Sequence, residues 1–418
     1  MNKNTIFRIN TWLLEVYDTL LREARLIFRD EGVIIFIFVL CALYPVLYAL
    51  IYNPEVVRDE RVVVVDNDRS NLSREWTRAL DATQEIKVIG YAANMNEARQ
   101  LMANHECYGI VEFPRDFAAT SERGEQAHMS LYCDMGVVMR YKAMFTALSN
   151  VSQAMSTSKQ AAVVAPVLYQ KGAIVNNRQV PVGNTQTGIA SAVLIFILPM
   201  VLQQSMILAV AMLHGGSIER RRRNRGYDPT IEYHTCVSAT IVGRTVCHLV
   251  MYIVPTLYVL LLLPLVFSFP HNADPIEVCI LAAPFLIASS LMAQVLQVYT
   301  NERETVFILF VFSSVVFVML SGVSWPRYEM SRWWRAVGDC VPSTWMCNAY
   351  VLMQSDGASL RQVALPYSVL CGMCLIFYFL AYAVERWVSR RRYRAWQEAA
   401  EVDPDALHRY DHIKNGVD

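Results

Sequence analysis

Six stretches without Asp, Glu, Lys or Arg divide this chain, and each is long enough to cross a lipid bilayer. A helix needs about 20 apolar residues to span the hydrocarbon core. One stretch stands alone near the N-terminus, and five follow close together after a long polar insert. The stretches cover residues 32–54, 179–218, 245–273, 278–301, 305–326 and 362–384. We therefore expect a membrane α-helical protein with six transmembrane helices and an α/β extracytoplasmic domain inserted between helices 1 and 2.

The composition favours an integral membrane protein with a sizeable polar part. Hydrophobic residues make up 54% of the chain and charged residues 18%, whereas soluble domains are about 45–50% apolar and 25% charged. The formal net charge is zero, which gives no support to nucleic acid as a partner. Residues 1–29 carry charges throughout and have no short apolar core, so we expect the first span to act as its own insertion signal.

Basic residues cluster at three places, and the positive-inside rule assigns all three to the cytoplasm. An even number of spans agrees with this, because it puts both termini on one side. The insert 55–180 and the segment 326–361 are then expected outside. The clusters are Lys3, Arg8, Arg22, Arg25 and Arg29 before the first span, Arg220, Arg221, Arg222, Arg223, Arg225 and Arg244 between the second and third, and Arg386, Arg390, Arg391, Arg392 and Arg394 after the last.

The charge pattern predicts the boundaries of the parts. We expect a cytoplasmic interfacial helix over 1–30, the first span over 31–54, the external domain over 55–180, the other five spans over 181–388, a cytoplasmic loop at 215–243, an external re-entrant segment at 322–361 and a cytoplasmic tail over 389–418. Residues 7–30 are amphipathic, which is typical of a helix lying in the membrane interface. A plain cytoplasmic extension of the first span is the alternative.

The insert alternates strand-like and helix-like patterns, which predicts a small α/β sheet. Strands are expected at 61–65, 86–89, 108–113 and 129–133, short helices at 73–80 and 96–102, and a long helix over 136–170. Cys107 and Cys133 lie in this part of the chain. Oxidising conditions outside the cell permit a disulfide between them, and two separate strand cysteines are the alternative.

The sequence contains little that points to catalysis. It has no GxxxxGK[ST] phosphate loop, so we do not expect the chain to bind a nucleotide in that way. The cysteine and histidine spacings predict no metal site, and we expect no catalytic residues and no cofactor. Asp66, Asp68 and Ser70 follow a strand and are expected to form a turn. His408 and His412 are expected to be solvated tail residues.

Two segments beside the membrane are informative. The arginine run 217–225 either holds the topology by touching anionic lipid or binds a cytoplasmic partner. Segment 322–361 has prolines and tryptophans in an apolar stretch that makes no full span. Non-helical backbone at membrane depth must be covered by protein or line a cavity, so we expect re-entrant or surface-lying short helices there.

Taken together, these motifs make the chain resemble the permease subunits of ABC type-2 exporters, in the branch with a large extracytoplasmic domain. The resemblance covers nearly the whole chain. It rests on Arg22-Glu23 to Arg29-Asp30, on Val62–Asp68 with Ser70 and Ser73, on Ala98, Gly109, Pro114, Phe117 and Gly124, and on Gly322, Pro326, Met330, Trp333 and Pro342. The sequence departs from the family where extra arginines follow Glu219 and Arg220, where Tyr227 follows Gly226, and where Ser331 follows Met330.

The resemblance implies a multi-pass subunit of the bacterial inner membrane that serves efflux, with multidrug exporters among its relatives. It implies pairing with a second permease, identical or related, and binding of one cytoplasmic ABC ATPase, which holds the ATP. A periplasmic adaptor and membrane lipid are further partners to expect. Residues expected to couple to the ATPase are Glu219, Arg220, Gly226, Arg29 and Asp30, and those that mark the external segment are Gly322, Pro326, Trp333 and Pro342.

Polar residues inside the spans are the candidates for a cargo path. They are Gln203, Gln204 and Ser205 in the second span and Ser313 and Ser314 in the fifth. Polar groups in hydrocarbon face the bundle or a cavity, so interhelical hydrogen bonds are the alternative. The near absence of charge in the spans favours amphiphilic or apolar cargo. A sensor that uses the external domain to bind a ligand is the competing function, but the sequence carries no cytoplasmic output domain.

Overall fold

A computed structural model describes residues 3–51, 57–123, 125, 127–134, 138–164, 189–223 and 236–402. Its contacts divide the chain into two compact units. The first combines Met1–Asn53 with Pro181–Asp418, and the second is Pro54–Val180. We call them the helical unit and the sheet unit. Gly226, His408 and His412 lie outside the described residues.

Among the described residues of the helical unit, six helices are long and apolar enough to cross a membrane. This confirms the six spans that the sequence predicts. They run over Glu31–Ile51 (α2, a π-helical turn and α3), Ala192–Arg223 (within α8), Val237–Val266 (α9, a π-helical turn and α10), Pro275–Tyr299 (α11 and a 3₁₀ turn), Arg303–Ser321 (α12) and Ala364–Arg391 (within α15).

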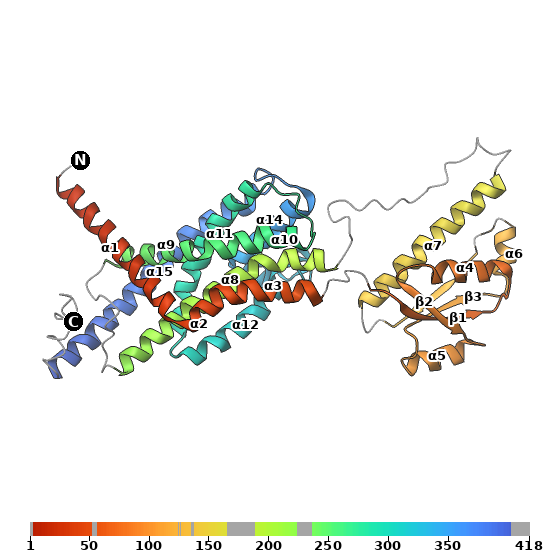
Figure 1. Cartoon of the computed structure of the whole chain (residues 1–418), viewed down its shortest axis with the longest axis horizontal. Coiled ribbons are helices and arrows are strands. Elements are labelled where there is room, and N and C mark those ends of the chain that lie inside the picture. Colours follow the sequence, from red (N-terminus) through yellow and green to blue (C-terminus); the bar gives the residue numbers. More distant parts are fainter. Residues whose placement is uncertain are drawn as a thin grey trace. The chain divides into compact units, whose positions relative to one another are not determined.

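The element bounds are α1 Lys3–Arg29, α2 Glu31–Ile34, π-turn Ile35–Val39, α3 Leu40–Ile51, α8 Ile189–Arg223, α9 Val237–Leu257, π-turn Tyr258–Leu262, α10 Leu263–Val266, α11 Pro275–Leu296, 3₁₀ turns Gln297–Tyr299 and Arg327–Glu329, α12 Arg303–Ser321, α13 Arg332–Asp339, α14 Pro342–Asp356 and α15 Ala364–Val402. Helix α1 and the C-terminal part of α15 leave the bundle at the same end as the last turns of α8 (Figure 1). We call this the arginine end, because Arg220–Arg223 lie there.

Helix α8 lies at the centre of the bundle. In its most apolar window 83% of residues are buried, against 18% in α12 and 17% in α15. A helix that is apolar all round is typical of such a central position. The outer faces of α3, α12 and α15 leave large apolar side chains exposed, which suits lipid or another subunit.

Three helices extend past the charge-free stretches at the arginine end. Residues 215–223 form the last turns of α8 and residues 237–243 begin α9, so much of the cytoplasmic loop expected at 215–243 is helical. Helix α15 likewise runs to Val402, into the segment expected as a tail. Arginine is a good helix former, and basic side chains are favourable at a helix C-terminus. A change from apolar to basic residues therefore marks the end of the apolar surface but not the end of the helix.

The external segment expected at 322–361 folds into two short helices. Gly322 ends α12 with φ of 105°, and Pro342 occupies the first turn of α14, where its missing N–H is not needed. Most of α14 is buried against α8, α11, α12 and α15. In contrast, α13 is largely exposed, with Trp333 85% exposed.

A π-helical turn in the third span helps to hold α14. Such turns leave a backbone carbonyl without its usual partner. Here the Leu260 carbonyl accepts a hydrogen bond of 2.6 Å from the Tyr350 hydroxyl and one of 3.2 Å from Gln354 Nε2. Both side chains belong to α14 and are buried. The turn therefore supplies the acceptor that fixes α14 inside the bundle.

The described part of the sheet unit has four strands in the order β2-β1-β3-β4. The bounds are β1 Glu60–Asp66, α4 Asn71–Asp81, β2 Ile86–Tyr91, α5 Met95–Ala103, β3 Gly109–Phe113, α6 Phe117–Glu122, β4 Ser130–Cys133 and α7 Val138–Val164. Strands β2, β1 and β3 are parallel, and β4 pairs antiparallel with β3. The small α/β sheet predicted from the sequence is present between the first and second spans.

Helices cover both faces of this sheet. Val62 and Val64 of β1 pack with α4 and α7, whereas Val63 and Val65 pack with α5, which explains the uninterrupted valine run. Asp66 accepts hydrogen bonds from the backbone N–H groups of Asp68 and Arg69, so it forms the expected turn.

Cys107 and Cys133 are free thiols. Cys107 packs in the apolar cluster on the α5 face, whereas Cys133 packs with Met144 in the cluster on the α7 face. A disulfide needs two Cβ atoms that point toward each other about 3.8 Å apart. Because these side chains lie on opposite sides of the sheet, the structure favours the two separate cysteines.

Candidate functional site

Two of the residues expected to couple to an ATPase meet at the arginine end through a third residue. Asp30 follows α1 and caps α2, where its Oδ1 accepts from the Val33 N–H at 3.4 Å. Its other oxygen forms an ion pair with Arg303, the first residue of α12. Glu219 of α8 accepts a hydrogen bond from the Arg303 N–H at 3.2 Å and lies 3.8 Å from its Nε. Arg303 therefore links the start of the first span to α8.

Two glycines of α8 make this contact possible. A Cβ at Gly215 would lie 3.1 Å from the Arg303 backbone N, and one at Gly216 would lie 2.7 Å from its Nη2. Both distances are shorter than almost all contacts of real Cβ atoms. The backbones of α8 and α12 thus approach closely at the position where Arg303 binds its carboxylates.

The other coupling residues stand apart from this cluster. Arg29 is exposed at the end of α1, where with Arg25, Leu21, Ala24 and Phe28 it lines a surface hollow. Arg220 lies one residue after Glu219 in the last turns of α8 and is partly buried. The structure thus brings Asp30 and Glu219 together, through a residue that the sequence analysis did not single out.

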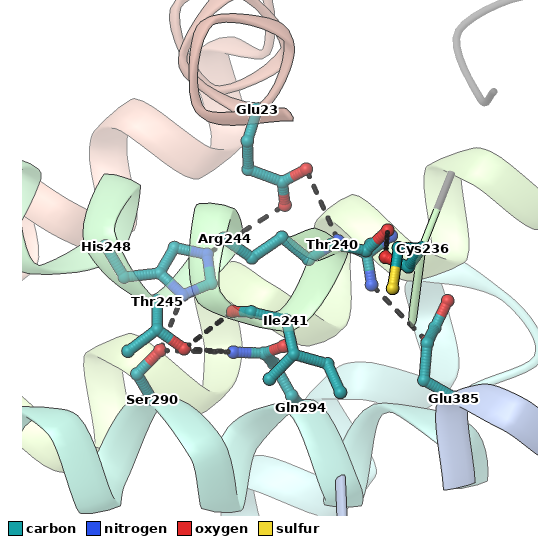
Figure 2. A network of polar contacts seen from close by, with 10 residues as sticks. All are labelled: Glu23, Cys236, Thr240, Ile241, Arg244, Thr245, His248, Ser290, Gln294 and Glu385. Carbon is teal, nitrogen blue, oxygen red and sulfur yellow. Dashed lines mark hydrogen bonds and ion pairs between the residues drawn. The ribbon is translucent and has the colours of Figure 1, made fainter. Parts of the chain in front are cut away.

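A second group of charges lies deeper at the same end (Figure 2). Arg244 of α9 points between Glu23 of α1 and Glu385 of α15, with N–O distances of 3.7 Å and 3.5 Å. The side chains of Arg244, Glu23 and Glu385 are only 12%, 9% and 7% exposed. His248 Nε2 lies 3.9 Å from the other oxygen of Glu23.

Hydroxyl and amide groups continue this network toward α11. His248 Nδ1 lies 2.8 Å from the Ser290 hydroxyl, and Gln294 Nε2 donates to the Thr245 hydroxyl at 2.9 Å. Buried polar groups are stable when such partners are present. The network therefore joins α1, α9, α11 and α15 at the arginine end (Figure 2).

Gly243 allows α1 to lie against α9 beside these charges. A Cβ at Gly243 would lie 2.8 Å from both the Val16 carbonyl oxygen and Thr19 Cβ. Trp12 Nε1 donates to the Ser238 hydroxyl at 3.0 Å, and Glu15 accepts from the Cys236 N–H at 3.0 Å. One side of α1 is thus docked on α9, while Leu13, Leu14 and Tyr17 remain exposed.

The candidate path residues divide into two groups. Gln204 lines a cavity of about 140 Å³ between α3, α8 and α12, and Ser314 lines it from the facing helix. The hydroxyl of Ser313 donates to Gln204 Oε1 at 3.3 Å. Apolar side chains form the rest of the wall, together with Tyr44: these are Leu40, Ile197, Met200, Val201, Phe310 and Val318.

Gln203 and Ser205 instead point into the subunit. Gln203 is fully buried, and its Oε1 accepts from the Ser343 backbone N–H at 2.7 Å, in the first turn of α14. Ser205 lies 3.0 Å from the Tyr252 hydroxyl and accepts from the Cys41 thiol at 3.1 Å. For these two residues the structure favours interhelical hydrogen bonding. Among the described residues, no three His, Cys, Asp or Glu side chains form a metal-binding group.

Comparison with known proteins identifies the kind of membrane protein. A search of curated proteins finds no match. The family described as "ABC-2 family transporter protein" matches residues 32–383, which reach from the first span through the sheet unit into the last span. Proteins of this family are the membrane components of transporters and work with an ATPase. The chain therefore belongs to the ABC-2 transporter family, as a multi-pass transmembrane transport subunit of the permease type.

Proposed function

We propose that this subunit exports amphiphilic or apolar cargo from the cytoplasm or the inner leaflet of a bacterial inner membrane. In this proposal the arginine end and both termini face the cytoplasm, and the sheet unit and α14 face outward. The three basic clusters support this orientation through the positive-inside rule. A separate ABC ATPase binds and hydrolyses the ATP, and this chain needs no cofactor of its own.

The cavity between α3, α8 and α12 is the observation that carries the proposal. Its wall is mainly apolar, with Gln204, Ser314 and Tyr44 as the polar groups. Small-molecule sites are typically apolar with a few placed polar groups. Gln204 is buried, and its Nε2 makes no hydrogen bond with the described residues. The wall of the cavity thus contains a buried amide donor that has no hydrogen-bond partner among these residues.

A second permease subunit would complete this path. Leu43 and Leu47 of α3 and Val311 and Val315 of α12 are exposed beside the cavity. Exposed apolar surface inside a membrane does not by itself require a protein partner, because lipid can cover it. A cavity open between two such faces, however, suits a path shared by two subunits, identical or related.

The ATPase is proposed to bind at the arginine end. Glu219, Arg220, Gly226, Arg29 and Asp30 are the residues proposed to couple its movement to the spans. The ion pairs of Arg303 support this, because they join the end of α1 to the last turns of α8. A periplasmic adaptor and bound lipid are further proposed partners. Trp333 on exposed α13 is proposed to contact the lipid headgroups on the external side of the inner membrane.

Transport assays with substitutions in the cavity test the proposal. The chain is co-expressed with its ATPase in inside-out vesicles, and ATP-dependent uptake of fluorescent amphiphiles is measured. Gln204→Ala removes a polar group from the cavity, so we expect uptake to fall roughly 5-fold, as for loss of one hydrogen bond. Ser314→Ala is expected to act in the same direction.

Ser368→Ala is the matched control. Ser368 lies on α15, is exposed, and bonds only within its own helix, to the Leu365 carbonyl. We expect uptake by this variant to equal that of the unmodified protein. Equal uptake by the Gln204→Ala and Ser368→Ala variants for every amphiphile tested would contradict the proposed path.

A further inference from the structure

Two arginines bind carboxylates from different helices on either side of the last turns of α1. Arg244 of α9 lies between Glu23 of α1 and Glu385 of α15 (Figure 2). Arg303 of α12 binds Asp30, the residue after α1, and Glu219 of α8. The short segment from Glu23 to Asp30 is therefore connected twice to the bundle.

The two connections reach different sets of spans. Arg244 joins α1 to α9 and α15, which also share an apolar cluster with α11 through Ile241, Leu291 and Ala381. Arg303 joins the end of α1 to α8 and α12, the helices that form the candidate cavity. A displacement of the end of α1 therefore acts on both sets at once.

We propose that Arg244 and Arg303 are positioning residues that hold the end of α1 against both sets of spans and transmit its movement to them. The proposal rests on the proposed function only for the source of movement, which is the ATPase. It assigns roles to two residues that lie at the edges of the charge-free stretches. Neither arginine touches the cargo cavity.

The two contacts differ in how much water reaches them. Arg244 and its carboxylates are nearly enclosed, so removing one partner leaves an uncompensated buried charge. Arg303 and Glu219 are 36% and 33% exposed, which makes their ion pair weaker and exchangeable. Arg244 therefore provides the firmer attachment of α1, and the contact between Arg303 and Glu219 is the weaker one.

The test separates the loss of the α1 attachment from the effect of leaving a buried charge without its partner. In the triple variant Glu23→Gln, Arg244→Gln and Glu385→Gln, no buried charge remains at this site. We expect its melting temperature to stay close to that of the unmodified chain. The backbone amides of Glu23–Arg29 should exchange with deuterium roughly 10-fold faster, because α1 is held less firmly. Cargo moved per ATP hydrolysed should fall several-fold.

Glu15→Gln is the control for the triple variant. Glu15 also contacts α9 from α1, through the Cys236 N–H, but takes no part in the Arg244 group. Amide exchange of Glu23–Arg29 and cargo moved per ATP should match those of the unmodified protein. If the triple variant keeps normal exchange and normal coupling, or if Glu15→Gln produces the same loss, the proposal for Arg244 is overturned.

Arg303→Gln tests the second contact and keeps an amide that can donate to Asp30, whose side chain is 12% exposed. We expect cargo moved per ATP to fall several-fold, with only a small decrease in melting temperature. Arg386→Gln removes the same charge from an exposed position on α15 and should leave both quantities unchanged. Equal coupling in these two variants would overturn the role of Arg303. If the unmodified complex does not transport, the proposed function fails, whereas deuterium exchange on the chain alone still decides the positioning of α1.

Discussion

The reactivity of Cys133 follows from the face of the sheet on which it lies. Burial raises the pKa of its thiol to about 11, and only the thiolate reacts with maleimides. At pH 8 roughly 0.1% of Cys133 is then thiolate. We expect slow labelling at pH 8 that accelerates as the pH rises toward 11, measured by mass spectrometry of the Cys133 peptide. Recovery of a Cys107–Cys133 disulfide peptide under non-reducing conditions would contradict this arrangement.

The contacts of individual side chains were the feature hardest to predict from the sequence. Gln203 and Gln204 have the same chemistry and adjacent positions, so composition assigned them one role. Successive residues of a helix point about 100° apart, and the structure turns Gln203 toward α14 and Gln204 toward the cavity. The pairing of Arg244 with Glu23 likewise depends on which helices meet. The sequence signal that could have indicated this pairing was the charged Arg244 at the end of an otherwise apolar helix.

Helix α14 depends on Gln203 at its N-terminal end. Replacing Gln203 with alanine would leave the buried Ser343 N–H without its acceptor. We expect the free energy of unfolding to fall by about 1–3 kcal/mol, the usual effect of an unpaired buried donor. Thermal unfolding in detergent measures this, and Gln204→Ala is the comparison. The assignment fails if Gln203→Ala is as stable as Gln204→Ala.

The elements themselves were largely predictable, because their signals are local. A span needs only a sufficient run of apolar residues, and all six appear. The valine run, the turn at Asp66 and the short helices of the sheet unit follow from equally local patterns. Helix ends were less accessible: α8 and α15 continue through their arginines, because the helix does not end where the apolar surface does.

The proposed orientation of the protein can be tested with two of its own thiols. Cys236 is exposed at the arginine end, beside α9, whereas exposed Cys340 follows α13 at the opposite end. If the arginine end faces the cytoplasm, a membrane-impermeant maleimide added to intact cells should modify Cys340 and spare Cys236. Inside-out vesicles should give the reverse pattern. Modification of Cys236 in intact cells would contradict the orientation; peptide mass spectrometry reads out both sites.

The family could be recognised from the sequence, whereas the cargo could not, because the two depend on different features of the molecule. The family match extends over residues 32–383, across both the spans and the insert. Cargo choice instead depends on the shape of a cavity built by α3, α8 and α12, which are distant in sequence. No single stretch of residues encodes that shape.

The paired glycines of α8 also restrict how two spans can shift. At Gly215 and Gly216 only a hydrogen atom separates the α8 backbone from the first residue of α12. One turn earlier, α8 presents the larger side chains of Met212 and Leu213. We therefore expect the two backbones to stay in contact at the glycines if the helices move during transport, while their far ends separate. The movement would then resemble rocking about a fixed point at Gly215 and Gly216.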